Sequence, residues 1–372
     1  MHREVDIGTK EQIMITPKTQ DLTIDEKRDE TESSEGHICI FPQKHPFVYH
    51  PIDGIVDTKI VNKFRDWIFE DLLKVHAKRK GNADHYKREK STVPMMHFKI
   101  ETIEDKNWFY TMGFPDQSWT DSHIDVCFYY LTKKSKYDPN MSYKFSTVDC
   151  NFKNIISSLH DVYSEDAEKL MAGGHVAHVN EYINGFRMHA AVPWHTVEDI
   201  YIPVNIKEKH HWVVAILSFS ERCISLYDSY ESSGHYSAVL DVIEKLSVTI
   251  PLCLEHCYFY IKKGIHVENH RRYKDKDSSD MFDVLFQENF PQQPSGSLDC
   301  GVYMVTYAEC LSYVHKILAT EFDPNALRTR YVATLWDYGT RKQELNAHSD
   351  VEAPLKPPRQ SRITSVTEVF DV

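Results

Sequence analysis

The chain has 372 residues, of which 41% are hydrophobic and 12% aromatic, and it carries a formal net charge of −12 at pH 7. This apolar content is sufficient for a packed core and excludes a chain that is disordered throughout. The acidic balance argues against nucleic-acid binding, which normally needs a basic surface, and no apolar run approaches membrane-spanning length. The N-terminus lacks the apolar core of a signal peptide, so we expect neither a membrane nor a nucleic-acid partner.

Both ends of the chain are polar and cannot bury enough apolar surface to offset their chain entropy. We predict a disordered acidic tail over residues 1–40 and a disordered, proline-containing tail over residues 341–372. The folded part is predicted over residues 41–340. It divides into an N-terminal helical extension, 41–107, and a core, 108–320, followed by the remainder of the folded part.

Apolar residues at helical spacing predict an amphipathic helix over residues 60–75. A basic stretch follows at 76–80, and it suits either a nuclear-import signal or a solvated helix end stabilised by the helix dipole. A second helix is predicted after Trp119, with Asp121 or Ser122 as its N-cap and an apolar stripe beyond it.

The centre of the chain has the alternating, β-branched pattern that is typical of strands. Strands are predicted at 199–204, 212–217, 223–227 and 257–261, and a helix at 241–246. The charged stretch 261–286 is interpreted as an inserted, solvated loop. Helices on either side of a short central sheet indicate an α+β domain.

The eight cysteines are scattered, which does not suit a disulfide scaffold and favours a reducing, intracellular location, in the nucleus or the cytoplasm, with the nucleus preferred. Cys253 and Cys257 flank His256, but no second pair follows at zinc-finger spacing, so no metal is expected. Cys300 differs, because it lies between the polar turn Ser295–Asp299 and an apolar run at helical spacing. Unpaired N–H groups in the first turn of that helix would favour a thiolate.

A cysteine hydrolase also needs an imidazole, a group that orients it and donors for the oxyanion. His211 opens one predicted strand and Asp228 follows the next, so a hairpin would bring both to the same end of the sheet. Gln293 precedes Cys300, and its amide N–H could form an oxyanion hole with the backbone N–H of that cysteine. Each residue alone also has an ordinary structural interpretation, since the chain has 21 histidines and an Asp–Cys–Gly turn often holds a buried thiol.

In chain order, His211–Trp212, Tyr227–Ser229 and Gln292–Tyr303 resemble the motifs of the Ulp1-like cysteine peptidase family, the SUMO proteases of family C48. The segment Trp119–Ile124 resembles the entry segment of that family. Together these motifs cover residues 108–320, and the sequence of the last motif most resembles plant members carried in transposon-related genes.

The resemblance implies a papain-like α+β fold, with a short central mixed sheet packed by helices and the catalytic cysteine at a helix N-terminus. It implies four catalytic roles: Cys300 as nucleophile, His211 as general base and acid, Asp228 as orienting carboxylate, and Gln293 as oxyanion donor. Trp119 and Trp212 resemble the aromatic residues that clamp the diglycine tail of a ubiquitin-like protein. Core packing is the structural alternative for both tryptophans.

Two departures from the family pattern concern the surroundings of the cysteine. Gln293 lies one residue further from Cys300 than in the familiar members, so Gln292 is the alternative oxyanion donor. The segment at Trp119 is one residue shorter and lacks the leucine that follows this tryptophan in the family, which would move the aromatic clamp.

The sequence therefore predicts a monomeric cysteine endopeptidase and isopeptidase that needs no cofactor and no metal. Its expected partner is a ubiquitin-like modifier, SUMO foremost, which it would cleave after the C-terminal Gly-Gly in processing or deconjugation. Two alternatives use the same fold: a non-catalytic, transposon-derived relative that binds modifiers, and an acyltransferase that passes the thioester to an amine. The intact Cys300, His211 and Asp228 weigh against the first alternative.

Overall fold

The structure is a computed structural model, and it describes residues 43–51, 56–78, 92–141, 143–165, 175–206, 210–230, 236–313 and 322–347. The predicted N-terminal tail, most of the predicted C-terminal tail and all but the first three residues of the basic stretch 76–80 lie outside these ranges. Helix α10 continues to Glu344, so the boundary predicted at residue 341 is wrong by about one helical turn.

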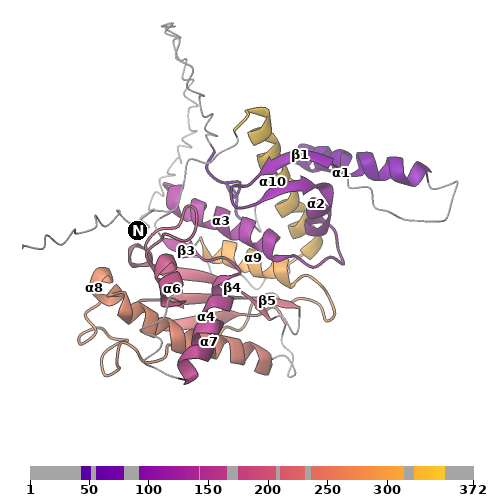
Figure 1. Ribbon diagram of the computed structural model, residues 1–372. Helices are drawn as coiled ribbons and strands as arrows, with labels where there is room; N and C mark the ends of the chain where they lie inside the picture. Colours follow the sequence, from indigo (N-terminus) through magenta and orange to yellow (C-terminus); the bar gives the residue numbers. More distant parts are fainter. Residues whose placement is uncertain are drawn as a thin grey trace, which may run out of the picture. The chain divides into compact units, whose positions relative to one another are not determined.

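A five-stranded mixed sheet lies at the centre of the described chain (Figure 1). Its strands, in spatial order, are β3 (Phe145–Thr147), β4 (Asp199–Ile206), β5 (His211–Ser218), β6 (Cys223–Tyr227) and β7 (Asp283–Phe286). The two outer pairs are parallel, whereas β4, β5 and β6 form an antiparallel meander. The central strands predicted from the alternating pattern are thereby confirmed.

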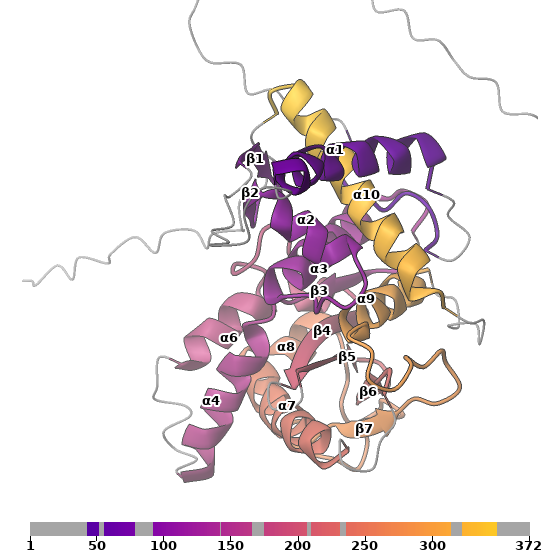
Figure 2. The same cartoon turned by 90° about the vertical axis from the view of Figure 1, so that its right-hand side faces the viewer.

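Helices pack on both faces of this sheet (Figure 2). One core contains α1 (Thr58–Lys78), α2 (Lys106–Gly113), α3 (Asp121–Tyr137), α9 (Cys300–Leu311) and α10 (Pro324–Glu344). The other contains α4 (Phe152–Glu165), α6 (His175–Ile183), η1 (Trp194–Thr196), α7 (Tyr236–His256) and α8 (Phe259–Lys263). This arrangement confirms the predicted α+β class.

Alternation along β5 explains why one strand can serve two cores. Successive side chains of a strand point to opposite faces. Trp212 and Val214 therefore pack with α9, while Val213 and Ala215 pack on the side of α7. Because all four are buried, β5 is the central strand that joins the two halves of the core.

The strand predicted at 257–261 is wrong. Tyr258 has a left-handed backbone with φ of 54°, which separates α7 from the short helix α8. Phe259 and Tyr260 bury their rings in the core from this helix, so tertiary packing overrides the β-propensity of the aromatic run. The expected helical extension 41–107 also contains two paired strands, β1 (Thr92–His97) and β2 (Thr102–Asp105).

The interpretation of residues 261–286 as a solvated loop is wrong for part of the segment. Tyr273 and Phe282 are fully buried, and the Tyr273 hydroxyl donates to the carbonyl of Phe219 at 2.8 Å. The buried Arg222 donates to the carbonyls of Met281 and Asp280. These contacts position the end of the segment beside the sheet, where it forms the edge strand β7.

Candidate active site

Cys300 is the first residue of α9 and is only 4% exposed. The turn before it contains Gly296 with φ of 78°, a conformation that an L side chain rarely adopts. The Cys300 sulfur lies 3.8 Å from the carbonyl oxygen of His210. The sequence prediction of a thiol in the first turn of a helix is confirmed.

His211 and Asp228 meet at one end of the sheet. His211 opens β5, Asp228 directly follows β6, and these two strands are antiparallel. The imidazole Nε2 lies 2.7 Å from Asp228 Oδ1, which also accepts the backbone N–H of Tyr230 at 3.0 Å. His211 also forms a hydrogen bond with the Cys300 thiol. Because Nε2 is bound to the carboxylate, this second bond is made by Nδ1.

This arrangement changes the protonation of the imidazole. Burial of His211 lowers its pKa, but the hydrogen bonds to Asp228 and Cys300 and the charges of both groups outweigh burial and raise the pKa from 6.5 to about 9. The histidine is therefore charged at neutral pH. An imidazolium beside a thiol is the electrostatic setting in which a thiolate nucleophile forms.

Gln293 and Gln292 occupy different positions around the same loop. The Gln293 carbonyl oxygen accepts from the Ser229 hydroxyl at 3.0 Å, which turns its amide nitrogen toward the loop before Cys300, 3.5 Å from the carbonyl of Ser297. Gln292 is exposed, and its amide donates to the backbone carbonyl of Asp228 at 3.2 Å. Gln293 is thus the glutamine whose amide is held facing the Cys300 loop.

Trp119 and Trp212 lie side by side against the start of α9, and each is 3% exposed. The Trp212 indole donates to the carbonyl of Trp119 at 3.2 Å, and the Trp119 indole donates to the carbonyl of Met112 at 3.0 Å. A Cβ at Gly301 would come within 2.7 Å of the Trp119 Cβ. Both tryptophans therefore contribute to the core that supports the cysteine, and a contact with substrate stays a prediction.

His123 is a buried histidine near this site with a structural role. It is the third residue of α3, and its Nδ1 accepts the backbone N–H of Thr120 at 2.9 Å. Its Nε2 lies 2.9 Å from the carbonyl of Trp108. Burial lowers the pKa of His123 to about 4, so the ring is neutral. The N-cap of α3 is Thr120 and neither of the two predicted residues, Asp121 and Ser122.

Sequence reasoning missed Arg328, which is fully buried on α10. Its guanidinium pairs with the carboxylate of Asp299, the residue before the cysteine, at 2.8 Å. Nothing in the sequence distinguishes this arginine from others on an ordinary polar helix. Only the packing of α10 against α2 and α9 brings it to the Cys300 loop.

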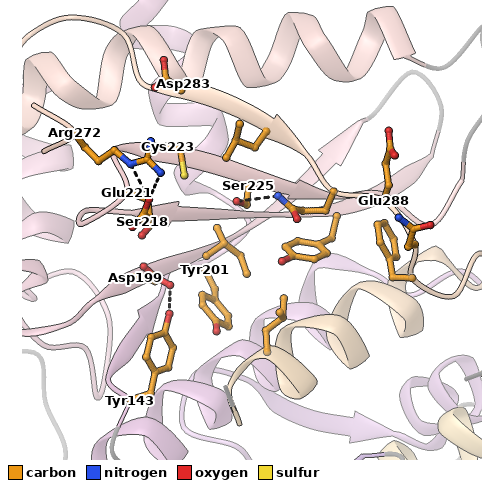
Figure 3. A pocket seen from close by; sticks show the side chains of 17 residues that line it. Tyr143, Asp199, Tyr201, Ser218, Glu221, Cys223, Ser225, Arg272, Asp283 and Glu288 are labelled. Atoms are coloured by element: carbon orange, nitrogen blue, oxygen red, sulfur yellow. Dashed lines mark hydrogen bonds and ion pairs between the residues drawn. The ribbon is translucent and has the colours of Figure 1, made fainter. Parts of the chain in front are cut away.

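A groove of about 690 Å³ lies on the sheet face beyond the C-terminal end of α9 (Figure 3). Tyr143 and Asp199 point toward one another in this groove, where the Tyr143 hydroxyl donates to the carboxylate. Burial raises the pKa of Asp199 to about 6. The groove is lined by β4 to β7 and contains neither Cys300 nor His211, so it is separate from the candidate catalytic residues.

Within the described ranges, no group of His, Cys, Asp and Glu side chains is arranged to hold a metal ion. Cys257 donates to the side-chain oxygen of Asn180 at 2.8 Å, which is a partner for a thiol and not a zinc site. None of the described helices is both long enough and apolar enough to cross a membrane.

A family model, the Ulp1 protease family C-terminal catalytic domain, matches residues 117–335, more than half of the chain. The chain belongs to the Ulp1 protease family. It is accordingly a cysteine peptidase with a Ulp1-like fold, and the family predicted from the sequence motifs is confirmed. The plant, transposon-associated subtype stays a prediction.

Solved structures of Ulp1 proteins are similar to this chain at low sequence identity. One is the SUMO protease Ulp1 with its catalytic cysteine oxidised to a sulfinic acid, with 17% identity, a TM-score of 0.44, and coverage of 76% of this chain and 95% of that one. Another is the C-terminal Ulp1 protease domain in complex with Smt3, the yeast ortholog of SUMO, with 16% identity, a TM-score of 0.47, and coverage of 77% and 97%. No curated protein sequence matches the chain.

Proposed function

We propose that this Ulp1-family peptidase cleaves after the C-terminal Gly-Gly of a ubiquitin-like modifier, with SUMO as the first candidate. The observation that carries the proposal is the contact of His211 with both Asp228 and Cys300, which forms a complete nucleophile, base and orienting acid. The modifier class is supported by the family itself and by the solved relatives, which are named as SUMO proteases.

The reaction would begin with attack of the Cys300 thiolate on the carbonyl carbon of the terminal glycine. The oxyanion would accept hydrogen bonds from the Gln293 amide and the backbone N–H of Cys300. Nδ1 of the His211 imidazolium then gives its proton to the leaving amine as the C–N bond breaks, which leaves a thioester. Water, deprotonated by the now neutral His211, attacks the thioester and releases the modifier with a free carboxylate.

Specificity for glycine would arise from the narrow space beside the two tryptophans. The Trp119 side chain contacts Gly301 so closely that little space is left beside the first turn of α9. A diglycine tail has no side chains and can enter a passage that excludes larger residues. In this proposal Trp212, which follows the catalytic His211, forms the other wall.

Cleavage of SUMO precursors and of SUMO linked to a lysine side chain tests this function. The full chain should cleave both kinds of bond, whereas Cys300→Ala and His211→Ala should not. Equal and negligible cleavage by the wild-type protein and Cys300→Ala, with other modifiers equally inert, would contradict the proposal and favour a non-catalytic modifier-binding protein. Transfer of the modifier to an added amine faster than to water would identify an acyltransferase.

A further inference from the structure

The carboxylate of Asp299 does not do what an aspartate at its position normally does. Asp299 is the N-cap of α9, where an Asp side chain ordinarily accepts the N–H groups of the first turn. In α10 the N-cap Asp323 behaves in this way and accepts the N–H groups of Asn325 and Ala326 at 2.9 and 3.3 Å. Asp299 makes no such bond, so the first turn of α9 has no side-chain cap.

Arg328 holds the Asp299 carboxylate away from the helix end. Its Nε donates to Asp299 Oδ1 at 2.8 Å, and the guanidinium is completely buried while the carboxylate is 14% exposed. Both an Arg–carboxylate pair and a cap bond from an ionised Asp are charge-assisted, and here the Asp299 side chain makes the first and not the second.

The remaining donors of Arg328 bind backbone carbonyls around two loops. At the first, which joins α2 to Trp119, they bind Met112 in the last turn of α2 at 3.3 Å, and Phe114 and Gln117 in the loop itself at 3.1 and 2.7 Å. The other leads into Cys300, with a bond to Leu298 at 3.1 Å. A single buried side chain therefore fixes the approach of both loops to the site.

We infer that Arg328 is a positioning residue that keeps the N-terminus of α9 uncapped and neutralises Asp299, so that the first-turn N–H groups serve the Cys300 thiolate and the oxyanion. The inference rests on the proposed function in one respect, that Cys300 is the nucleophile. A free carboxylate at Asp299 would compete for those N–H groups and would place a negative charge beside the thiolate.

The test is the pH dependence of Cys300 alkylation by iodoacetamide, followed by mass spectrometry of the peptide that contains this cysteine. In Arg328→Met the pH midpoint of alkylation should rise by roughly one pH unit, because the released Asp299 carboxylate disfavours the thiolate. Asp299→Asn should move the midpoint in the opposite direction, because the charge of Arg328 is no longer balanced. The double variant should return toward the wild type, and kcat should fall more than KM rises in Arg328→Met.

Arg330→Met is the matched control, since Arg330 is a buried arginine on the same helix that pairs with Glu309 at 2.8 Å. It should lower the stability of the protein without moving the Cys300 midpoint. If Arg328→Met does not fold, the shift in Asp299→Asn still decides the matter. An unmoved midpoint in Asp299→Asn, or an equal shift in Arg330→Met, would overturn the inference. Alkylation of Cys300 needs no modifier. If the variants show the midpoint shifts described above but the wild-type protein cleaves no modifier, the result counts against the proposed function alone.

Discussion

The charge of Asp228 should set the upper pH limit of activity. Asp228→Asn removes this charge and retains the size of the side chain beside the His211 Nε2 atom. The pKa of His211 rises from 6.5 to about 9 in the intact site, against the lowering effect of burial. At about 1.4 kcal/mol per pKa unit, this rise corresponds to roughly 3 kcal/mol in favour of the imidazolium.

The direction of the effect follows from the sign of that shift. The imidazolium is held up to a pH of about 9 and is lost as the pH rises through this value. Without the Asp228 charge, burial of His211 becomes the leading influence and lowers its pKa. The alkaline limb of kcat/KM should therefore move from near pH 9 to about 7 or below. The rate at pH 7 should fall by about twofold for a limb at pH 7 and by roughly a further tenfold for each pH unit that the limb lies below 7, because only the protonated fraction is active.

A diglycine-terminated fluorogenic substrate, assayed from pH 5 to 10, measures this limb. Asp323→Asn is a suitable control, because it changes a remote helix cap on α10 and should leave the profile in place. If folded Asp228→Asn keeps an alkaline limb near pH 9, the assignment of His211 and Asp228 as an interacting catalytic pair is refuted.

The other predictions concern the surroundings of the cysteine. Gln293→Ala should lower kcat by about 10²-fold, as expected for one oxyanion donor, while Gln292→Ala should change kcat little. Steady-state kinetics of both variants measure this, and a larger loss of kcat in Gln292→Ala would make Gln292 the donor. Gly301→Ala should lower the free energy of unfolding by about 1–3 kcal/mol, since its Cβ would lie 2.7 Å from the Trp119 Cβ; an unchanged denaturation midpoint would contradict this. Trp212→Ala should raise KM for a diglycine substrate and allow cleavage of a substrate with alanine at the terminal position. The ratio of kcat/KM for substrates ending in Gly and in Ala measures this preference. An unchanged ratio would assign this tryptophan to core packing alone.

The sequence was sufficient to predict the pairing of His211 with Asp228 because that pairing is local in the fold. Two adjacent strands joined by a short turn are almost always antiparallel, so the start of one and the end of the next meet. The position of Cys300 was predictable for a similar reason. A glycine-containing turn followed by apolar residues at helical spacing marks a helix start wherever it occurs.

Features that depend on distant packing were not predictable in this way. Arg328 reaches the loop at Asp299 only because α10 packs beside α9. No local sequence pattern indicates that these two helices pack together. Strand β7 was missed because it is short, half exposed and paired in parallel with β6 across a long connection. The segment at Phe259 has a strand-like composition, but it forms the short helix α8. This helix packs against α7 and η1 and buries the Phe259 ring in the core.

Covalent labelling tests whether Cys300 is the nucleophile of a diglycine-specific peptidase. The intact chain would be incubated with a panel of ubiquitin-like modifiers that carry an electrophile in place of the terminal glycine carboxylate, and the adduct located by peptide mass spectrometry. We expect one adduct per chain, on Cys300, formed with a SUMO probe and abolished by His211→Ala. Labelling on any of the other seven cysteines, or none with any modifier in the panel, would contradict it.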